Sequence, residues 1–285
     1  MENIIICDEE KLKEIEKRFQ EGGLDKVHIL ADFDKTLIRA FVDGKEAPSV
    51  ISVLRDGSYL TPDYARKAQE LYDKYHPLEK DPNISGEEKK RLMAEWWNTH
   101  FELLINSGLN KKDIEKVIRS GKIKFRDGFS ELADFSKDNN IPLVIMSSAG
   151  LGQESISQRL EQEGKLYSNI YIISNSFEWD KNGKAIAVKQ PIIHGANKDE
   201  TLVQNFPEIF KAIKDKKNVI LLGDNLDDVG MVEGFDYDNL IKIGFFNGKT
   251  KEGEDIYKSV YDILVLNDSS LDFVSHFLKR IPSRA

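Results

Sequence analysis

The chain contains one cysteine, Cys7, among its 285 residues. A single thiol cannot form an internal disulfide, so the fold must be stable without one, which suits a reducing compartment. Cys7 ends the short apolar run Ile4-Ile5-Ile6. We therefore expect it to be a small buried side chain rather than a nucleophile.

The sequence also lacks a basic excess and long apolar runs. Its formal net charge is −8, which is unlike the basic surface of nucleic-acid-binding proteins. No apolar run approaches the length that spans a membrane, and the first residues lack the basic region and apolar stretch of a signal peptide. We expect a cytoplasmic monomer with a small-molecule substrate and no nucleic-acid or membrane partner.

The histidines do not form a recognisable metal site. His76, His100, His194 and His276 show no metal-ligand spacing, and His28 lies inside an apolar run. We therefore expect His28 to be part of the core and assign no histidine a catalytic role.

Six short apolar runs predict a parallel sheet. They are 27–31, 142–146, 170–173, 218–222, 240–243 and 263–266. Runs that are apolar on both faces and rich in branched side chains are typical of buried parallel strands. Helical stretches separate most of them, for example 128–137, 153–163, 199–215 and 269–280. The alternation predicts a doubly wound α/β fold with a mainly parallel sheet.

About a hundred residues after the first run contain no convincing buried strand but carry helix signals. The signals are Thr61-Pro62-Asp63 as a helix start with Pro77 as its end, Ser85 with Glu88, and Asn110 with Asp113 closed by Gly121. We predict a helical cap over residues 45–125, inserted into an α/β core formed by 1–44 and 126–285.

Acidic residues follow the predicted strands, at the sheet edge where α/β proteins bind ligands. Asp32 and Asp34 are two residues apart, so period-two geometry points both the same way. One carboxylate can attack phosphorus to form an aspartyl-phosphate, and the other can protonate the leaving oxygen and then activate water. Asp224 ends another predicted strand. Any one such acid could simply cap a helix, but three together suit Mg²⁺ and phosphoryl chemistry.

Three further residues are candidates for substrate binding. Ser148, before Ala149-Gly150, could hold a phosphate oxygen with its hydroxyl and adjacent N–H groups, or be only a helix N-cap. Lys198 could neutralise phosphate, although most lysines are solvated. Glu79, expected in a loop after Pro77, could accept a hydrogen bond from an exocyclic amine of a nucleobase, or be a solvated acid.

Together these residues resemble the motifs of the haloacid dehalogenase superfamily. Asp32-Phe33-Asp34-Lys35-Thr36-Leu37 resembles its DxDxT signature, and Ser148, Lys198 and Gly223-Asp224 with Asp228 stand in chain order as the later motifs. A closer resemblance is to the cytosolic pyrimidine 5′-nucleotidases of type III. The segments that carry it are 31–37, 75–82, Glu95-Trp96, Ser148-Ala149-Gly150, Asn197-Lys198 and 220–224.

The resemblance implies a Rossmann-like core and Mg²⁺-dependent dephosphorylation of nucleoside 5′-monophosphates such as CMP and UMP. It implies that Asp32 is the nucleophile and Asp34 the general acid and base. The implied ligands of Mg²⁺ are Asp32, the main-chain carbonyl of Asp34, and Asp224. The implied substrate-binding residues are Ser148, Ala149 and Lys198 for the phosphate and Glu79 for the nucleoside.

Some features leave alternatives open. The fourth motif contains Asp227 and Asp228 where the family usually has GDSxGD, and an extra serine leaves open whether Ser147 or Ser148 binds phosphate. A related phosphatase for another small phosphomonoester, such as phosphoserine, would share the same core. An inactive phosphate-binding module is disfavoured by the presence of both Asp32 and Asp34. Asp34-Lys35-Thr36 also resembles the phosphorylation site of cation-pumping ATPases, which require membrane helices.

Overall fold

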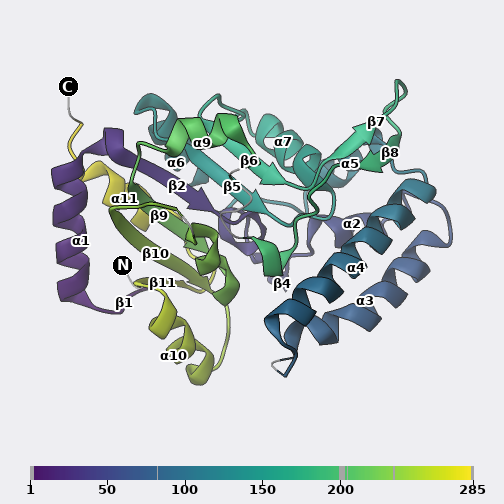
Figure 1. Cartoon of the computed structure of the whole chain (residues 1–285), viewed down its shortest axis with the longest axis horizontal. Coiled ribbons are helices and arrows are strands. Elements are labelled where there is room, and N and C mark those ends of the chain that lie inside the picture. Colours follow the sequence, from purple (N-terminus) through teal and green to yellow (C-terminus); the bar gives the residue numbers. More distant parts are fainter. Residues whose placement is uncertain (1–2, 82, 199–202, 204, 234, 284–285) are drawn as a thin grey trace.

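A seven-stranded sheet forms the centre of the computed structural model, which describes residues 3–81, 83–198, 203, 205–233 and 235–283 (Figure 1). The strands lie in the order β1-β11-β10-β9-β2-β5-β6. Their bounds are β1 Ile4–Ile6, β2 Val27–Ala31, β5 Leu143–Ser147, β6 Ile170–Ser174, β9 Asn218–Gly223, β10 Asn239–Phe246 and β11 Ile263–Leu266. Each of the six predicted runs forms a strand, and all pairs are parallel except β1 with β11. The predicted doubly wound α/β fold is confirmed.

Both faces of the sheet are covered, which explains why its strands are continuously apolar. Ile29 and Ala31 of β2 face one cluster of buried side chains, and Leu30 between them faces another. The first cluster includes side chains of α1 (Glu9–Gly22), α6 (Phe129–Asp138), α7 (Gly152–Gln162) and α11 (Asp272–Lys279), and the second includes those of α9 (Pro207–Ile213). Because successive strand residues alternate between faces, both layers contact every central strand.

The antiparallel edge strand β1 was not predicted, and it changes the environment of Cys7. The thiol follows β1 and is half-buried, so the prediction of a buried side chain was wrong. An edge strand has a neighbour on one side only, which leaves part of Cys7 open. Burial and the nearby Asp262 carboxylate raise the pKa of the thiol, which disfavours the thiolate that a nucleophile requires.

Helices fill most of the segment between β2 and β5. They are α2 (Val50–Asp56), α3 (Tyr64–Lys80), α4 (Gly86–Asn106) and α5 (Lys111–Arg119), preceded by the short strands β3 (Phe41–Val42) and β4 (Lys45–Glu46). Ser85 and Asn110 cap α4 and α5 as predicted. In Figure 1, α3 and α4 lie side by side at the opposite end of the molecule from α1. We call α2–α5 the cap helices; the domain boundaries at 45 and 125 stay a prediction.

Pro77 does not end its helix, contrary to the prediction. Helix α3 continues to Lys80, with Pro77 inside it. A proline in the last turn of a helix removes only one main-chain hydrogen bond. Packing offsets that loss, because Leu78 contacts the small cluster formed by Tyr75, Met93 and Trp96. Tertiary contact between α3 and α4 therefore extends the helix past its sequence signal.

Two further parts of the chain lie beside the central sheet. Strands β7 (Phe177–Trp179) and β8 (Ala185–Val188) form a hairpin whose Phe177 ring makes a T-shaped contact with Phe101 in α4. The helix predicted over 199–215 is described only from Pro207 to Ile213, and residues 199–202 and 204 lie outside the described residues. In the described part of the chain, no helix is long and apolar enough to cross a membrane.

His28 in β2 is a core residue, as predicted. Its ring is fully buried, its Nδ1 donates to the carbonyl oxygen of Lys216 at 2.6 Å, and its ring centroid lies 5.2 Å from that of Phe235. Burial lowers the pKa of His28 to about 4. The folded protein therefore holds this imidazole neutral at a pH where an unfolded chain would protonate it.

We predict that this histidine makes the fold less stable in mild acid. Its folded pKa lies below its ordinary value of 6.5, so its stabilising contribution is complete above pH 6.5 and is lost as the pH falls toward 4. His28→Gln keeps an N–H donor for Lys216 but cannot titrate. Between pH 7.5 and 5, urea unfolding of the variant should show a loss of unfolding free energy about 2 kcal/mol smaller than that of the wild type. An identical loss in both proteins would contradict this prediction.

Candidate active site

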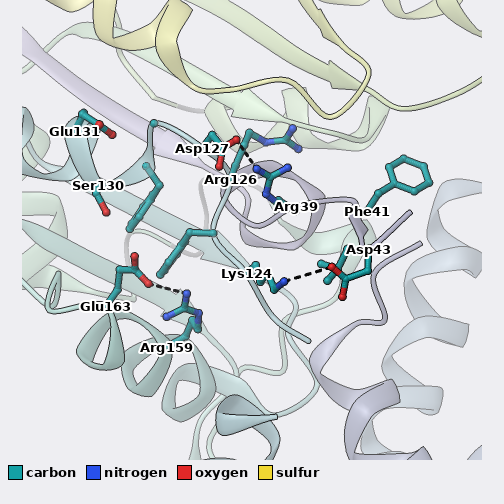
Figure 2. Close-up of a pocket in the computed structure, with 14 residues that line it drawn as sticks. Arg39, Phe41, Asp43, Lys124, Arg126, Asp127, Ser130, Glu131, Arg159 and Glu163 are labelled. Atoms are coloured by element: carbon teal, nitrogen blue, oxygen red, sulfur yellow. Dashed lines mark hydrogen bonds and ion pairs between the residues drawn. The ribbon is translucent and has the colours of Figure 1, made fainter. Parts of the chain in front are cut away.

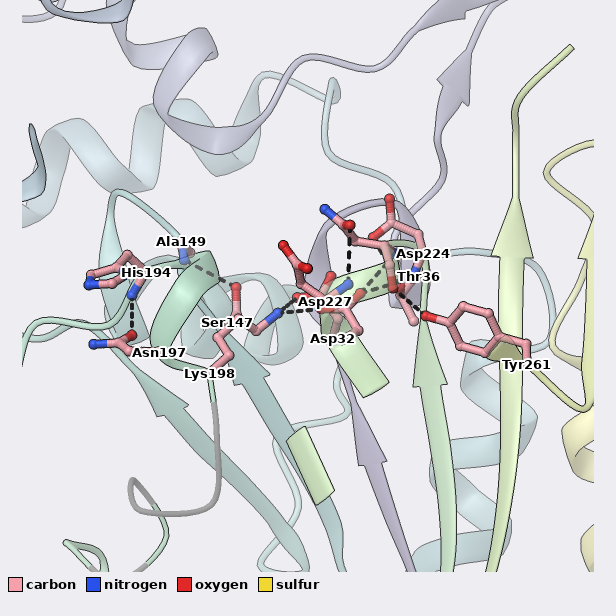
Figure 3. A network of polar contacts seen from close by, with 12 residues as sticks. Asp32, Thr36, Ser147, Ala149, His194, Asn197, Lys198, Asp224, Asp227 and Tyr261 are labelled. Atoms are coloured by element: carbon pink, nitrogen blue, oxygen red, sulfur yellow. Dashed lines mark hydrogen bonds and ion pairs between the residues drawn. The ribbon is translucent and has the colours of Figure 1, made fainter. Parts of the chain in front are cut away.

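The ends of three adjacent strands bring the predicted acidic and hydroxyl residues together. Strands β9, β2 and β5 are neighbours, and they end at Gly223, Ala31 and Ser147. Figure 3 shows Asp32, Asp224, Ser147 and Lys198 gathered at this edge. The main-chain N–H of Asp32 donates to the carbonyl of Leu222 at 2.9 Å, which fixes the first carboxylate beside the strand that carries Asp224.

A tight turn, η2 (Phe33–Leu37), carries the DxDxT residues away from β2. Phe33 and Leu37 are fully buried and anchor the turn in the core, and Lys35 adopts a left-handed conformation with φ of 58°. Asp34 therefore lies in a turn and not, as period-two geometry had suggested, on a strand. It lines the cavity described below, and its Oδ1 is buried without a hydrogen-bond partner in the described structure.

Lys198 lies between two carboxylates. Its ammonium donates to Oδ1 of Asp32 and, at 3.0 Å, to Oδ1 of Asp228. The other Asp228 oxygen accepts the main-chain N–H groups of Asp224 at 3.1 Å and Asn225 at 3.0 Å. Asp228 is buried and Asp227 is exposed, so Asp228 is the acid of this loop that belongs to the cluster. The sequence left open the roles of these two residues.

Burial raises the pKa values of the carboxylates at this edge of the sheet. Burial raises the pKa of Asp32 well above its usual range; the Lys198 ammonium opposes this shift, and the neighbouring carboxylates add to it. Burial, with help from Asp228, raises the pKa of Asp224 to about 7, and burial raises that of Asp34. Burial alone would lower the pKa of Lys198, but Asp228 and Asp32 raise it above its usual value. One ammonium is thus surrounded by more acidic groups than it can neutralise.

The donor set suits a divalent cation. Carboxylate oxygens of Asp32, Asp224 and Asp228 lie within 4.8 Å of one another. Mg²⁺ prefers such oxygen ligands, and its charge would stabilise the ionised forms that burial disfavours. Two of these residues, Asp32 and Asp224, were predicted as ligands, and Asp228 was not. The assignment of the Asp34 main-chain carbonyl as a ligand stays a prediction.

The loop after β5 separates the roles of the two serines. Ser147 is buried, and its hydroxyl accepts the N–H of Ala149 at 3.1 Å, so both groups help to form the loop. Ser148 is partly exposed and lines the cavity together with Ala149 and Gly150. The position of Ser148 therefore makes its hydroxyl the better placed of the two for a ligand.

A cavity of about 240 Å³ extends from this edge to the cap helices. Asp34 and Ser148 line it on the core side, and Glu79 lines it on the cap side. Its aromatic lining residues are Tyr72, His76, Trp96, Trp97 and His100. The Trp96 and Trp97 rings stack at 5.8 Å, and Tyr72 stacks on His76 at 4.5 Å. Flat, mostly apolar walls with a few polar groups are typical of a ligand pocket.

Two features of the cavity differ from the prediction or were not foreseen. Glu79 lies in the last turn of α3 rather than in a loop, and its Oε2 is 3.2 Å from Nδ1 of His76. Gly150 touches the cap so closely that an added Cβ would lie 3.0 Å from both the Ile51 and Trp97 side chains. The core loop and two cap helices are therefore in direct contact beside the cavity.

A larger cavity of about 670 Å³ contains none of the predicted site residues (Figure 2). Its charged lining residues include Arg39, Lys124 and Arg159, each paired with an acid. It lies where the chain passes between the core and the cap helices. Size alone would therefore select the wrong cavity. The smaller cavity is the one lined by predicted site residues, namely Asp34, Glu79, Ser148 and Ala149.

Sequence reasoning missed two tyrosines that hold the Asp224 loop. Tyr257 donates to the carbonyl of Asp224 at 2.8 Å, and Tyr261 donates to the carbonyl of Asn225. Tyr257 lies in α10 (Lys251–Val260) and Tyr261 follows it. No motif connects this segment with the acidic loop, so only its packing against the end of β9 reveals the contact.

A parallel sheet with acidic residues after β2 and β9, a lysine between them and helices inserted after the first acid is the arrangement of a haloacid dehalogenase-like fold. In agreement, a phosphoserine phosphatase structure described as a phospho-aspartyl intermediate analogue has the same fold, with a TM-score of 0.51 and 17% identity over 88% of this chain and 98% of the other. The chain belongs to the pyrimidine 5′-nucleotidase (UMPH-1) family, whose model matches residues 35–282.

Relatives cover nearly the whole chain. The 7-methylguanosine phosphate-specific 5′-nucleotidase of Gallus gallus is 33% identical over 273 residues, which are 95% of this chain and 93% of that protein. The crystal structure of cytosolic 5′-nucleotidase IIIB bound to cytidine superposes with a TM-score of 0.86 at 26% identity, covering 98% of this chain and 93% of the other. The chain is therefore a 5′-nucleotidase, a hydrolase of phosphomonoesters.

We predict that Mg²⁺ raises the melting temperature of the protein through Asp224. A ligand present at a hundredfold excess over its Kd stabilises the folded state by about 2.7 kcal/mol. Asp224→Asn should abolish most of the shift and should itself be more stable without Mg²⁺, because the variant relieves repulsion among buried carboxylates. Differential scanning fluorimetry with and without MgCl₂ measures both effects.

The matched control is Asp227→Asn, in the same loop but with an exposed side chain outside the cluster. It should keep the full Mg²⁺ shift. An undiminished shift in Asp224→Asn would rule out this carboxylate as a ligand.

Proposed function

We propose that the protein hydrolyses nucleoside 5′-monophosphates, preferably the pyrimidine nucleotides CMP and UMP, with Mg²⁺ and through an aspartyl-phosphate on Asp32. The observation that carries this proposal is the shared cavity. Asp34 and Ser148 line its core side, and an aromatic wall with Glu79 lines its cap side. A phosphate ester bound at the carboxylates would place its leaving group in this cavity, where aromatic rings can stack on a base.

The first half of the reaction transfers the phosphoryl group to the enzyme. Lys198 and Ser148 bind the phosphate oxygens, and an Asp32 oxygen attacks phosphorus as the bond to the 5′-oxygen breaks. Asp34 gives its proton to the departing 5′-oxygen. The raised pKa of Asp34, caused by burial, suits a group that must hold this proton near neutral pH.

The second half releases phosphate. Asp34, now ionised, takes a proton from water, whose oxygen attacks phosphorus and breaks the bond to Asp32. The products are the nucleoside, inorganic phosphate and the original carboxylate. Asp32, Asp224 and the Asp34 main-chain carbonyl would hold Mg²⁺, which would supply positive charge to keep Asp32 ionised and to neutralise the phosphate. Asp228 orients Lys198 and the Asp224 loop through the contacts of its two oxygens.

The cap side of the cavity suits an amino-bearing base. The Glu79 carboxylate can accept a hydrogen bond from the exocyclic amine of cytosine. A second candidate substrate is 7-methylguanosine monophosphate, because the Gallus gallus relative is named for it and a positively charged base would stack well on Trp96 or Trp97 beside Glu79. The aromatic lining argues against a small polar ester such as phosphoserine, which offers no surface for stacking.

A substrate panel with the Glu79→Gln variant tests the substrate. Wild type should release phosphate from CMP and UMP with higher kcat/KM than from AMP, phosphoserine, phosphoglycolate and p-nitrophenyl phosphate. Glu79→Gln should lose about tenfold in kcat/KM for CMP, since one base contact is worth about 1–3 kcal/mol, and should keep its rate on p-nitrophenyl phosphate. 7-Methylguanosine monophosphate as the best substrate would favour the second candidate.

Glu70→Gln is the control for this comparison, because Glu70 lies on the same helix but is exposed and paired with Arg66. It should leave every rate unchanged. Absence of any preference for nucleotides in the wild type would defeat the proposal.

We predict that Asp32→Asn loses phosphate release by more than about 10³-fold, because the amide cannot form the covalent intermediate. The protein should stay folded, since Asn has the same shape and Lys198 keeps its contact with Asp228. Phosphate release and circular dichroism measure the two properties on one sample. A fully active Asp32→Asn protein would refute the mechanism.

A further inference from the structure

Two segments connect η2, the turn that carries Asp34, with the cap helices, and they run side by side. We call η2 the catalytic turn. The chain leaves η2 through residues 38–42 and returns through residues 123–126. Ile38 and Phe125 form an antiparallel bridge, and Arg39 donates its N–H to the carbonyl of Lys124 at 2.9 Å. Figure 2 shows Arg39, Lys124 and Arg126 at this crossing. Main-chain contacts therefore join the two connections directly beside the turn.

Arg126 is buried at the crossing and bonds the catalytic turn itself. Its side chain has 0% exposure. Nε donates to the carbonyl of Thr36 at 2.7 Å, one terminal nitrogen donates to the carbonyl of Lys35, and the other donates to Ser269 at 2.9 Å. The guanidinium also lies 4.4 Å above the Phe245 ring. It therefore contacts the turn only one and two residues after Asp34.

Asp268 completes the arrangement from the opposite side. One of its carboxylate oxygens lies 2.9 Å from Arg126 and accepts the N–H of Ala40 at 2.8 Å. Its other oxygen accepts the N–H of Phe41 at 3.1 Å. Asp268 is itself in a left-handed conformation, with φ of 53°. Residues other than glycine keep such conformations only where surrounding contacts hold them.

The catalytic turn also contains a residue whose left-handed conformation must be held by its contacts. Lys35 has a φ of 58°, and its carbonyl is one of the groups that Arg126 holds. A buried ion pair is by itself weak evidence for stability, because desolvation offsets the attraction. Here, however, Arg126 donates hydrogen bonds to carbonyls of the catalytic turn. Asp268 accepts hydrogen bonds from main-chain N–H groups of the outgoing connection. The pair thus joins the turn, both connections and the end of β11.

We propose that Arg126, supported by Asp268, is a positioning residue for catalysis: it holds the turn that carries Asp34 in the conformation that the chemistry requires. The inference rests on the proposed roles of Asp32 and Asp34. Displacement of a reacting group by about 1 Å costs about 10²-fold in rate.

The test compares Arg126→Met, Arg126→Lys and Asp268→Asn with the control Arg159→Met. Arg159 is also a largely buried arginine, with 10% side-chain exposure. It donates to a carbonyl of the returning connection, that of Ile123 at 2.9 Å, and lies 4.5 Å above the Phe125 ring. It does not contact residues 33–37 through any hydrogen bond that the described structure records. The control removes similar burial and charge without touching the turn.

Activity is measured on p-nitrophenyl phosphate, which requires the core chemistry but no nucleobase, and is corrected for the folded fraction. Arg126→Met should lose about 10- to 100-fold in kcat with little change in KM. Arg126→Lys should recover part of the loss, because an ammonium can still donate to one of the carbonyls. Hydrogen exchange of the Ala40 and Phe41 amides should accelerate in Arg126→Met and Asp268→Asn. Arg159→Met should change neither kcat nor these amides.

The proposal is overturned if kcat is unchanged in the Arg126 variants, or if it falls equally in Arg159→Met. Should Arg126→Met not fold, Arg126→Lys and Asp268→Asn decide the question by the same comparison. Failure of the proposed function is distinguishable: a wild type that prefers no nucleotide refutes the substrate, and a fully active Asp32→Asn refutes the mechanism, each without reference to Arg126.

Discussion

The contact on which the active site depends is the buried ammonium of Lys198 between Asp32 and Asp228. It joins two strand ends that are far apart in the chain, and it brings one positive charge into a group of carboxylates that also includes Asp34 and Asp224. Positive charge is therefore scarce at this edge of the sheet. The proposed Mg²⁺ would supply the positive charge that this group of carboxylates lacks.

An acidic protein that acts on an anionic substrate needs positive charge placed locally at its site. The net charge of −8 offers no general attraction for phosphate, so binding must rely on charge placed locally. Lys198 provides one such charge, and the clustered oxygens of Asp32, Asp224 and Asp228 suit a divalent cation that provides more. The main-chain contacts of Asp228, Tyr257 and Tyr261 hold the loop of Asp224 against the repulsion of its neighbours.

Much of the core could be predicted from the sequence because local pattern and global fold agree there. Strands buried on both faces must be continuously apolar, and the acids that follow β2 and β9 must meet at one edge. Other features depend on partners that no local pattern shows. Pro77 stays inside α3 because Leu78 packs against a neighbouring helix, and this moves Glu79 from a loop to a helix.

The acidic loop illustrates the same limit. Asp227 and Asp228 are adjacent in sequence, and only the three-dimensional path of the loop shows that Asp228 enters the cluster. The serines after β5 are equivalent in the sequence as well, until the N–H of Ala149 is seen to engage Ser147. Hydrogen bonds that no sequence pattern shows thus bear on the finer assignments, whereas the class of chemistry was visible in the motifs.

The contact at Gly150 limits how closely the core loop and the cap helices can approach beside the cavity. A methyl group there would come within 3.0 Å of both Ile51 and Trp97, so the clearance between the core loop and the cap is narrower than one carbon atom. Atoms this close cannot absorb added volume without shifting. The close approach of the core loop and the cap helices is therefore possible only because residue 150 has no side chain, and Gly150→Ala would push them apart beside the cavity.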